Sequence, residues 1–183
     1  MKVLAVSGSL RRDSHNTKLL HAAREVASDG VELELWEGLK AVPPYDQDDD
    51  VDPAPAAVAA LRAAIAGADA VLFATPEYNS SIPGALKNAL DWASRPIATN
   101  VLRNKPVAVV GASAGAFGAV WAQAELRKVL AAIGARVVDA EVAVGHAADR
   151  FDDDGRLVDD LREQLAEVVV ALVAETAPVA VAA

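Results

Sequence analysis

Near its start the sequence reads Val3-Leu4-Ala5-Val6-Ser7-Gly8-Ser9-Leu10-Arg11-Arg12-Asp13-Ser14-His15-Asn16-Thr17. The apolar residues that begin this stretch predict a buried parallel strand, because such strands are covered on both faces. A polar loop follows, and a helical pattern opens near Asn16. Open α/β sheets hold phosphates with this order of strand, loop and helix, using backbone N–H groups and a helix N-terminus. The stretch predicts either a phosphate-binding loop or an ordinary turn whose Ser and Asn side chains only cap the helix.

The bulk composition limits the class of protein. The chain has 183 residues, of which 53% are hydrophobic and 23% are charged, and this fits one domain with a full core. We expect residues 1–176 to form this domain and residues 177–183 to be a tail, either disordered or packed on a partner. The formal net charge of −9 disfavours nucleic acid as a partner, because its phosphates require clustered Lys and Arg.

Several kinds of site and location are also disfavoured. The chain has no cysteine, which excludes disulfides, thiol catalysis and cysteine-based metal sites. No apolar run approaches the roughly 20 residues that a membrane-spanning helix requires. The first residues lack the layout of a signal peptide, so we expect a cytoplasmic location.

Short apolar runs alternate with helical patterns along the whole chain. The runs predict strands over residues 3–6, 31–35, 70–74 and 107–110 and from 136 onward, and helices over 16–28, 55–65, 84–94, 119–133 and 158–174. This alternation predicts a three-layer, doubly wound α/β fold with a parallel five-stranded sheet. A flavodoxin-like strand order, 2-1-3-4-5, has its topological switch point between the first and third strands.

Two polar loops follow the strands that flank this switch point. Ser7–Thr17 follows the first strand, and Thr75–Ser81 follows the third. Ligands of such sheets bind at the carboxyl ends of the strands at the switch point. We therefore favour a ligand site over a plain turn.

The sequence lacks the usual motifs of hydrolysis and nucleotide binding. It has no G-x-S-x-G elbow and no Walker A motif, and the glycines of Gly111–Gly118 follow the fourth strand, where a nicotinamide fingerprint is not expected. The histidines are scattered: we expect His15 and His21 at the surface and assign no role to His146. The Asp48–Asp50 run is read as a solvated loop in preference to a metal site, because no His or Glu stands nearby. The surrounding loop, 46–52, is a candidate border of the pocket.

Three loops thus remain as candidate walls of a site. The first suits a phosphate, the Pro-Glu-Tyr-Asn segment at 76–79 offers backbone groups and an aromatic ring, and the small residues of 111–118 let a flat ring approach the backbone. Flavin mononucleotide (FMN) fits this description. Its redox chemistry is its own, which agrees with the shortage of acid and base residues.

Three motifs carry a family resemblance. They are Gly8-Ser9-Leu10-Arg11-x-x-Ser14-x-Asn16, Pro76-Glu77-Tyr78-Asn79-x-Ser81-Ile82-Pro83-Gly84-x-Leu86-Lys87-Asn88-x-Leu90-Asp91-Trp92 and Gly111-x-Ser113-x-Gly115-x-x-Gly118. From about Lys2 to Val142 the chain resembles the NADPH-dependent FMN reductase family, a flavodoxin-like family that includes quinone, chromate and azo-dye reductases. The family commonly has Gly-Gly where this chain has Gly118-Ala119, a difference that would narrow the pocket slightly.

The resemblance implies an FMN-dependent enzyme that takes hydride from NAD(P)H and reduces quinones or similar acceptors, such as free FMN, chromate or azo compounds. No side chain is expected to be catalytic, because the flavin carries the chemistry. The residues implied to hold the FMN phosphate are Ser9, Arg11, Ser14, Asn16 and Thr17. Those implied to line the ring and the ribityl chain are Pro76, Glu77, Tyr78, Asn79 and, at the other edge of the ring, Ser113.

Alternatives remain open for several of these residues. Arg11 could be a surface charge, Tyr78 a packing residue, and Ser113 a helix N-cap. Family members use the 84–94 helix for dimer contact, which implies a homodimer or homotetramer, although Trp92 could belong to the intramolecular core. Two other functions also remain: a flavodoxin-type electron carrier and a non-enzymatic module that binds flavin or nucleotide.

Overall fold

The structure is a computed structural model that describes residues 1–152 and 154–177. Its centre is a parallel sheet in the order β2-β1-β3-β4-β5, with β6 also paired to β4. The strands are β1 (Lys2–Ser7), β2 (Glu32–Trp36), β3 (Ala70–Thr75), β4 (Pro106–Ala112), β5 (Arg136–Val137) and β6 (Ala143–Val144). This order confirms the flavodoxin-like topology that the sequence predicts.

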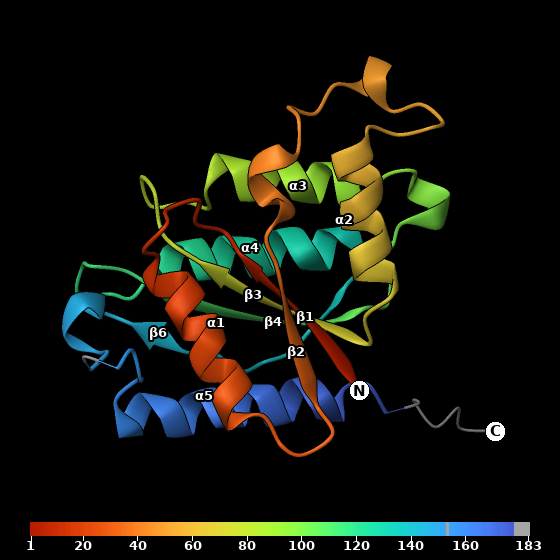
Figure 1. The fold of residues 1–183 in the computed structure, drawn as a ribbon. Helices are drawn as coiled ribbons and strands as arrows, with labels where there is room; N and C mark the ends of the chain where they lie inside the picture. Colours follow the sequence, from red (N-terminus) through yellow and green to blue (C-terminus); the bar gives the residue numbers. More distant parts are fainter. Residues whose placement is uncertain (153, 178–183) are drawn as a thin grey trace.

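Helices cover both faces of the sheet and complete three layers (Figure 1). They are α1 (His15–Val26), α2 (Ala56–Ala66), α3 (Gly84–Ala93), α4 (Val120–Ile133) and α5 (Asp159–Ala174). The α1 and α5 helices pack on one face, and α2, α3 and α4 pack on the other. Each predicted helix is present, because its apolar positions recur at the spacing that buries one face.

The fifth strand differs from its prediction. It consists of two short pieces, β5 and β6, which pair with the two ends of β4. Between them the guanidinium of Arg127, on α4, donates to the carbonyl oxygens of Val138 at 2.7 Å, Ala140 at 2.6 Å and Val109 at 3.1 Å. These carbonyls are therefore bound to a side chain where a continuous strand would use them in ladder bonds. Within the described residues the sheet has six strands in place of the predicted five.

Trp92 belongs to the intramolecular core, so its assignment to a dimer contact is wrong. Its side chain is fully buried, and its indole Nε1–H donates to the carbonyl of Pro43 at 2.9 Å. The ring of Tyr45 meets it edge-on, with ring centroids 4.9 Å apart. On the preceding turn Asn88 donates to the same carbonyl at 2.8 Å and accepts the Tyr45 N–H at 2.7 Å. This face of α3 therefore holds the segment that follows β2.

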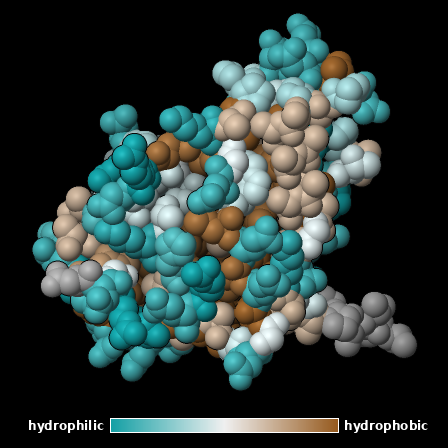
Figure 2. Space-filling model, in the orientation of Figure 1, coloured by the Kyte–Doolittle hydropathy of each residue, from teal (hydrophilic) through white to brown (hydrophobic). Residues whose placement is uncertain are grey.

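The acidic loop projects from the molecule at the top of Figure 1, and its surface is mainly hydrophilic (Figure 2). Asp50 pairs with Arg62 of α2 at 2.9 Å. No residue of 46–52 lines the cavities at the carboxyl ends of the described strands, so the expectation that this loop borders the pocket is wrong. In the described part of the chain, no helix has the length and apolar character to cross a membrane. The predicted tail lies, from residue 178 onward, outside the described residues.

Candidate functional site

The loops after β1, β3 and β4 meet at the carboxyl edge of the sheet, on the left of Figure 1. They enclose a cavity of about 210 Å³. Its lining consists of Ser9, Arg11, Ser14, His15, Asn16, Pro76, Glu77, Tyr78, Ala112, Ser113 and Ala114. The structure thus brings together the site residues that the sequence predicts, except for Thr17 and Asn79, which do not line this cavity.

Hydroxyl groups fix the first loop and cap the helix behind it. Ser14 Oγ accepts the N–H of Thr17 at 3.3 Å, which makes Ser14 the N-cap of α1. Thr17 Oγ1 donates to Ser7 Oγ at 3.0 Å and lines a neighbouring cavity. Ser9 Oγ accepts the N–H of Arg11 at 3.4 Å. The two interpretations of this loop are therefore compatible, because Ser14 caps the helix and also lines the cavity.

Hydrogen-bond donors remain free in the same loop. Within residues 1–152 and 154–177, the backbone N–H groups of Leu10, Asp13 and Ser14 have no acceptor. They lie before the N-terminus of α1, whose dipole favours an anion. The Arg11 side chain is exposed beside them and adds a full positive charge. This donor set fits the phosphate of FMN.

Asn16 contributes to the geometry of the cavity through a buried hydrogen-bonded pair. Its side-chain amide donates to the carbonyl of Ala112 and accepts the N–H of Ala112, both at 2.9 Å. Because the amide is bound in this way, its main task is to tie the first loop to the end of β4. A phosphate can still meet the backbone N–H of Asn16 in the first turn of α1.

The second loop turns tightly and presents an aromatic ring. Tyr78 and Ser81 exchange two backbone hydrogen bonds, of 3.0 and 3.1 Å, across Asn79 and Ser80. Asn79 and Ser80 have φ values of 53° and 59°, so the two residues form a left-handed two-residue turn. Tyr78 keeps 48% of its surface exposed and lines the cavity, while Asn79 is exposed at the tip. The alternative of Tyr78 as a packing residue does not fit this exposure.

Glu77 joins the second loop to the helix after β4. Its Oε2 accepts the N–H groups of Trp121 and Ala122, each at 3.1 Å. The N-cap of α4 is Ala119, which has no side chain able to cap, so the Glu77 carboxylate takes that place. A carboxylate at a helix N-terminus is stabilised by the helix dipole. Glu77 therefore lines the cavity and fixes the orientation of α4.

The third loop is held by close backbone contacts. Ser113 Oγ accepts the N–H of Gly115 at 3.1 Å, and α4 begins only at Val120, so the N-cap alternative for Ser113 is wrong. Gly118 has a φ of +59°, and a Cβ there would lie 2.4 Å from the carbonyl carbon of Ala143. Only glycine allows this approach, which sets the loop against β6.

His15 is a cavity residue that the sequence placed at the surface. It is half-buried, its ring stacks on Phe151 with centroids 6.1 Å apart, and its Nδ1 is buried without a partner in the described chain. Burial, followed by the charges of Lys18 and Arg11, lowers the pKa of His15 below its usual value. Its position directly after the N-cap Ser14 was the available signal. No sequence signal indicates that Phe151 contacts His15, because the two residues lie far apart in the sequence.

Arg11 and Tyr78 also line a second hollow, of about 400 Å³. The other residues that line this hollow are Gly8, Leu10, Pro83, Gly84 and Ala85. Small and apolar walls of this kind accept a flat ring system. The arrangement can therefore hold an anion at the first loop and a planar group near Tyr78, which are the two ends of FMN.

Comparisons with known proteins identify the family of this chain. A model of the NADPH-dependent FMN reductase family matches residues 1–149. An NAD(P)H-dependent FMN reductase of Pseudomonas aeruginosa is 43% identical over 166 residues, which are 90% of this chain and 89% of the relative. A 2-hydroxy-1,4-benzoquinone reductase of a Burkholderia species is 42% identical over 90% of each chain. A flavoenzyme NAD(P)H:(acceptor) oxidoreductase of Paracoccus denitrificans superposes with a TM-score of 0.85 and 36% identity over 95% of this chain and 98% of that one. The chain belongs to the NADPH-dependent FMN reductase family.

Proposed function

We propose that this protein is an FMN-dependent oxidoreductase that takes hydride from NAD(P)H and passes the electrons to a quinone or a similar acceptor. The observation that carries the proposal is the meeting of Arg11, Ser14 and Tyr78 in one cavity at the switch point of the sheet. The Burkholderia relative, a reductase of a benzoquinone, supports quinones as the acceptor class.

The residues of the chain bind and orient the cofactor in this proposal. FMN supplies the redox chemistry when it is bound. Arg11 and the free N–H groups of Leu10, Asp13 and Ser14 bind its phosphate, and Ser9 and Ser14 hold the loop that presents them. Pro76, Glu77 and Asn79 shape the second loop so that Tyr78 lies beside the ring. Asn16 and Thr17 support the first loop from behind.

The third loop, which follows β4, lies at the other edge of the FMN ring in this proposal. Ala112, Ser113 and Ala114 are small and leave room for a ring at the backbone. The N–H of Ala114 has no acceptor in the part of the chain that the structure describes. It can donate to a carbonyl oxygen of the ring, and such a donor stabilises charge that collects there.

We also propose the extent of the domain, its location in the cell and its oligomeric state. Residues 1–176 act as one FMN-binding domain in the cytoplasm, where NAD(P)H is available, and the domain assembles into a homodimer or homotetramer through the 84–94 helix. Exposed aromatic surface supports assembly: Phe117 and Trp121, which are 63% and 49% exposed, pack edge to face with ring centroids 5.0 Å apart.

An absorbance spectrum of the purified protein, followed by anaerobic titration with NADH and NADPH, tests the function. We expect a flavin spectrum, or one restored by added FMN, that bleaches when either nucleotide is added. A protein that binds FMN but is not reduced by either nucleotide would be an electron carrier, and the proposal would be wrong. A protein that does not take up FMN would contradict the cofactor assignment as well.

A further inference from the structure

A separate cavity of about 330 Å³ lies on the other side of the first loop, between that loop and the segment after β2. Its lining includes Arg11, Arg12, Trp36, Glu37, Leu39 and Lys40. It shares Ser9 and Arg11 with the cavity proposed for FMN. A ligand placed here would therefore begin next to the phosphate end of the flavin site.

Positive charge dominates this cavity, although the chain as a whole is acidic. Arg11, Arg12 and Lys40 face a single carboxylate, Glu37, in a chain of net charge −9. Among the described residues, the side chains of Arg12 and Lys40 have neither an ion pair nor a hydrogen bond. Unpaired cations that line one cavity are suited to a phosphate group.

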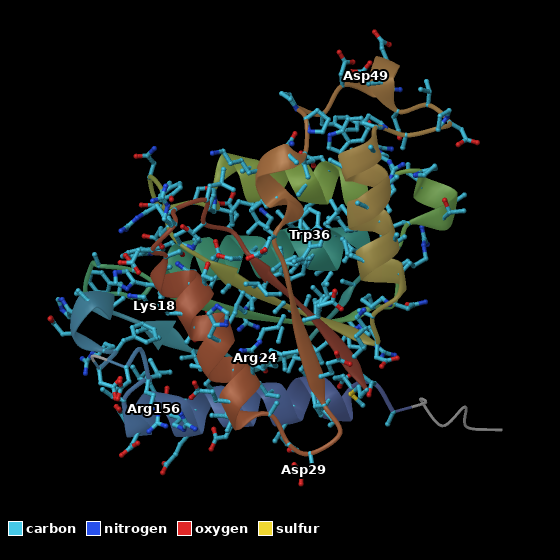
Figure 3. All side chains as sticks on the ribbon, viewed as in Figure 1. Lys18, Arg24, Asp29, Trp36, Asp49 and Arg156 are labelled. Carbon is cyan, nitrogen blue, oxygen red and sulfur yellow. The ribbon has the colours of Figure 1, made fainter. Side chains whose placement is uncertain are left out.

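An aromatic and apolar wall stands beside these cations. Trp36 lies half-buried at the end of β2 (Figure 3). The apolar side chains of Leu35 and Leu39 line the same cavity. The indole ring packs directly over Gly38, where a Cβ would lie 2.4 Å from a ring carbon. Only glycine permits this contact, so the backbone fixes the position of the ring. Trp36 also lines the cavity, and an aromatic side chain in such a place can stack on a purine base.

We propose that this cavity binds the adenosine 2′-phosphate half of NADPH, with the base near Trp36 and the 2′-phosphate between Arg12 and Lys40. The inference rests on the proposed use of NAD(P)H and deepens it to a preference for NADPH over NADH. Ser9 and Arg11 line both cavities, so adenosine bound here lies next to the flavin cavity toward which the nicotinamide must extend.

The direct test measures binding of 2′,5′-ADP and of 5′-AMP to the FMN-loaded protein by calorimetry. The first ligand carries the 2′-phosphate and the second does not. We expect 2′,5′-ADP to bind roughly tenfold or more tightly than 5′-AMP, because its 2′-phosphate makes charge-assisted hydrogen bonds that 5′-AMP cannot make. Equal affinity for the two ligands overturns the inference. This result does not depend on the activity of the enzyme, since the measurement needs no reduction of the flavin.

A charge-matched pair of variants gives the second test. Arg12→Ser/Lys40→Ser removes the two free cations, whereas Arg24→Ser/Lys128→Ser removes two exposed cations elsewhere, with Arg24 toward the far end of α1 (Figure 3). We expect the first double variant to lower the ratio of kcat/KM for NADPH to that for NADH by about tenfold or more. The control pair leaves the ratio at its wild-type value.

The remaining outcomes separate this inference from the proposed function. If NADH and NADPH reduce the flavin equally well in the wild type and in the Arg12→Ser/Lys40→Ser variant, the inference is wrong and the oxidoreductase proposal stands. If neither nucleotide reduces the flavin, the proposed function fails, and the calorimetric comparison still decides whether the cavity takes a 2′-phosphate. If FAD binds more tightly than FMN and displaces 2′,5′-ADP, the cavity belongs to the AMP half of a flavin dinucleotide and the inference is wrong.

Discussion

The two ends of the parallel sheet use their cations in different ways. At the amino end a cavity of about 370 Å³ contains Arg103, Lys105 and Arg136. Each of these side chains donates to a carbonyl of the chain itself: Arg103 to Ile97 at 3.2 Å, Lys105 to Ala68, and Arg136 to Glu175 at 2.5 Å. Burial lowers the pKa of Lys105, and Asp69 partly opposes this shift.

At the carboxyl end the cations have no such partners. The side chains of Arg11, Arg12 and Lys40 make no hydrogen bond or ion pair within the described chain. A cationic cavity is therefore a candidate anion site only where the backbone does not already use the charges. At the amino end the cations hold strands and loops together, whereas at the carboxyl end they are available to a phosphate.

The largest expected effect concerns the backbone packing that shapes the carboxyl end. Gly118→Ala places a methyl group 2.4 Å from the Ala143 carbonyl carbon at a positive φ, and we expect it to lower the free energy of unfolding by roughly 3 kcal/mol or more. Gly84→Ala is the matched control, because a Cβ there meets nothing within 4 Å. Urea denaturation of both variants measures the difference, and equal midpoints would contradict the packing described here.

A smaller loss is expected from the buried amide that ties the first loop to β4. Asn16→Ala leaves both polar groups of Ala112 buried without their partner, so we expect a loss of about 2–4 kcal/mol and weaker FMN binding. Asn100→Ala makes the matching change near the amino end, where Asn100 is half-buried and bonds to Ile133 and Leu102. It should cost less stability and leave the affinity for FMN at the wild-type value. Equal loss of FMN affinity in both variants would argue against a site at the carboxyl end.

The comparison of the two ends can be tested directly with one arginine from each. Arg11→Ala removes a free charge, and we expect a roughly 10- to 100-fold weaker affinity for FMN, because a charge-assisted hydrogen bond contributes about 1.5–3 kcal/mol. Arg103→Ala removes a charge that the chain already uses, and the affinity should stay within error of wild type. Flavin fluorescence titration measures both. An unchanged affinity in Arg11→Ala would remove this residue from the phosphate site.

The smallest effect concerns the pH dependence of stability. The folded-state pKa of His15 is lowered, mainly by burial, so its neutral form is favoured in the folded protein. Its contribution to stability is present above the unfolded-state pKa of about 6.5 and is lost as the pH falls through the lower folded-state value. We expect His15→Gln to lose less stability than wild type between pH 7.5 and pH 5.5, by urea denaturation at each pH. A larger loss in the variant would reverse the assigned sign.

Features set by local patterns could be predicted from the sequence. Strands that are buried on both faces, such as β1 and β3, have continuous apolar runs. Helices that bury one face have apolar residues at helical spacing. The alternation of these two patterns along the chain was enough to predict the topology of the sheet. The position of the loops at the switch point then located the cavity. Arg11, Ser14 and Tyr78 line it for this reason.

Features set by distant partners could not be predicted. The Asn16 amide is bound by Ala112, and the His15 ring is stacked on Phe151, in each case by a residue far along the chain. The interruption of the fifth strand depends on Arg127 reaching across from α4, and nothing in the local sequence indicates where its guanidinium lies. The motif predicts Thr17 at the phosphate, but in the structure its hydroxyl donates to Ser7 Oγ.

Whether the first loop holds the phosphate of FMN can be measured by comparing two flavins. FMN and riboflavin differ only by that phosphate, so their dissociation constants for the wild-type protein isolate its contribution. Since several charge-assisted hydrogen bonds are involved, we expect FMN to bind roughly 100-fold or more tightly than riboflavin. Equal affinities for the two flavins would mean that the first loop does not recognise the phosphate, and its assignment as the phosphate site would be wrong.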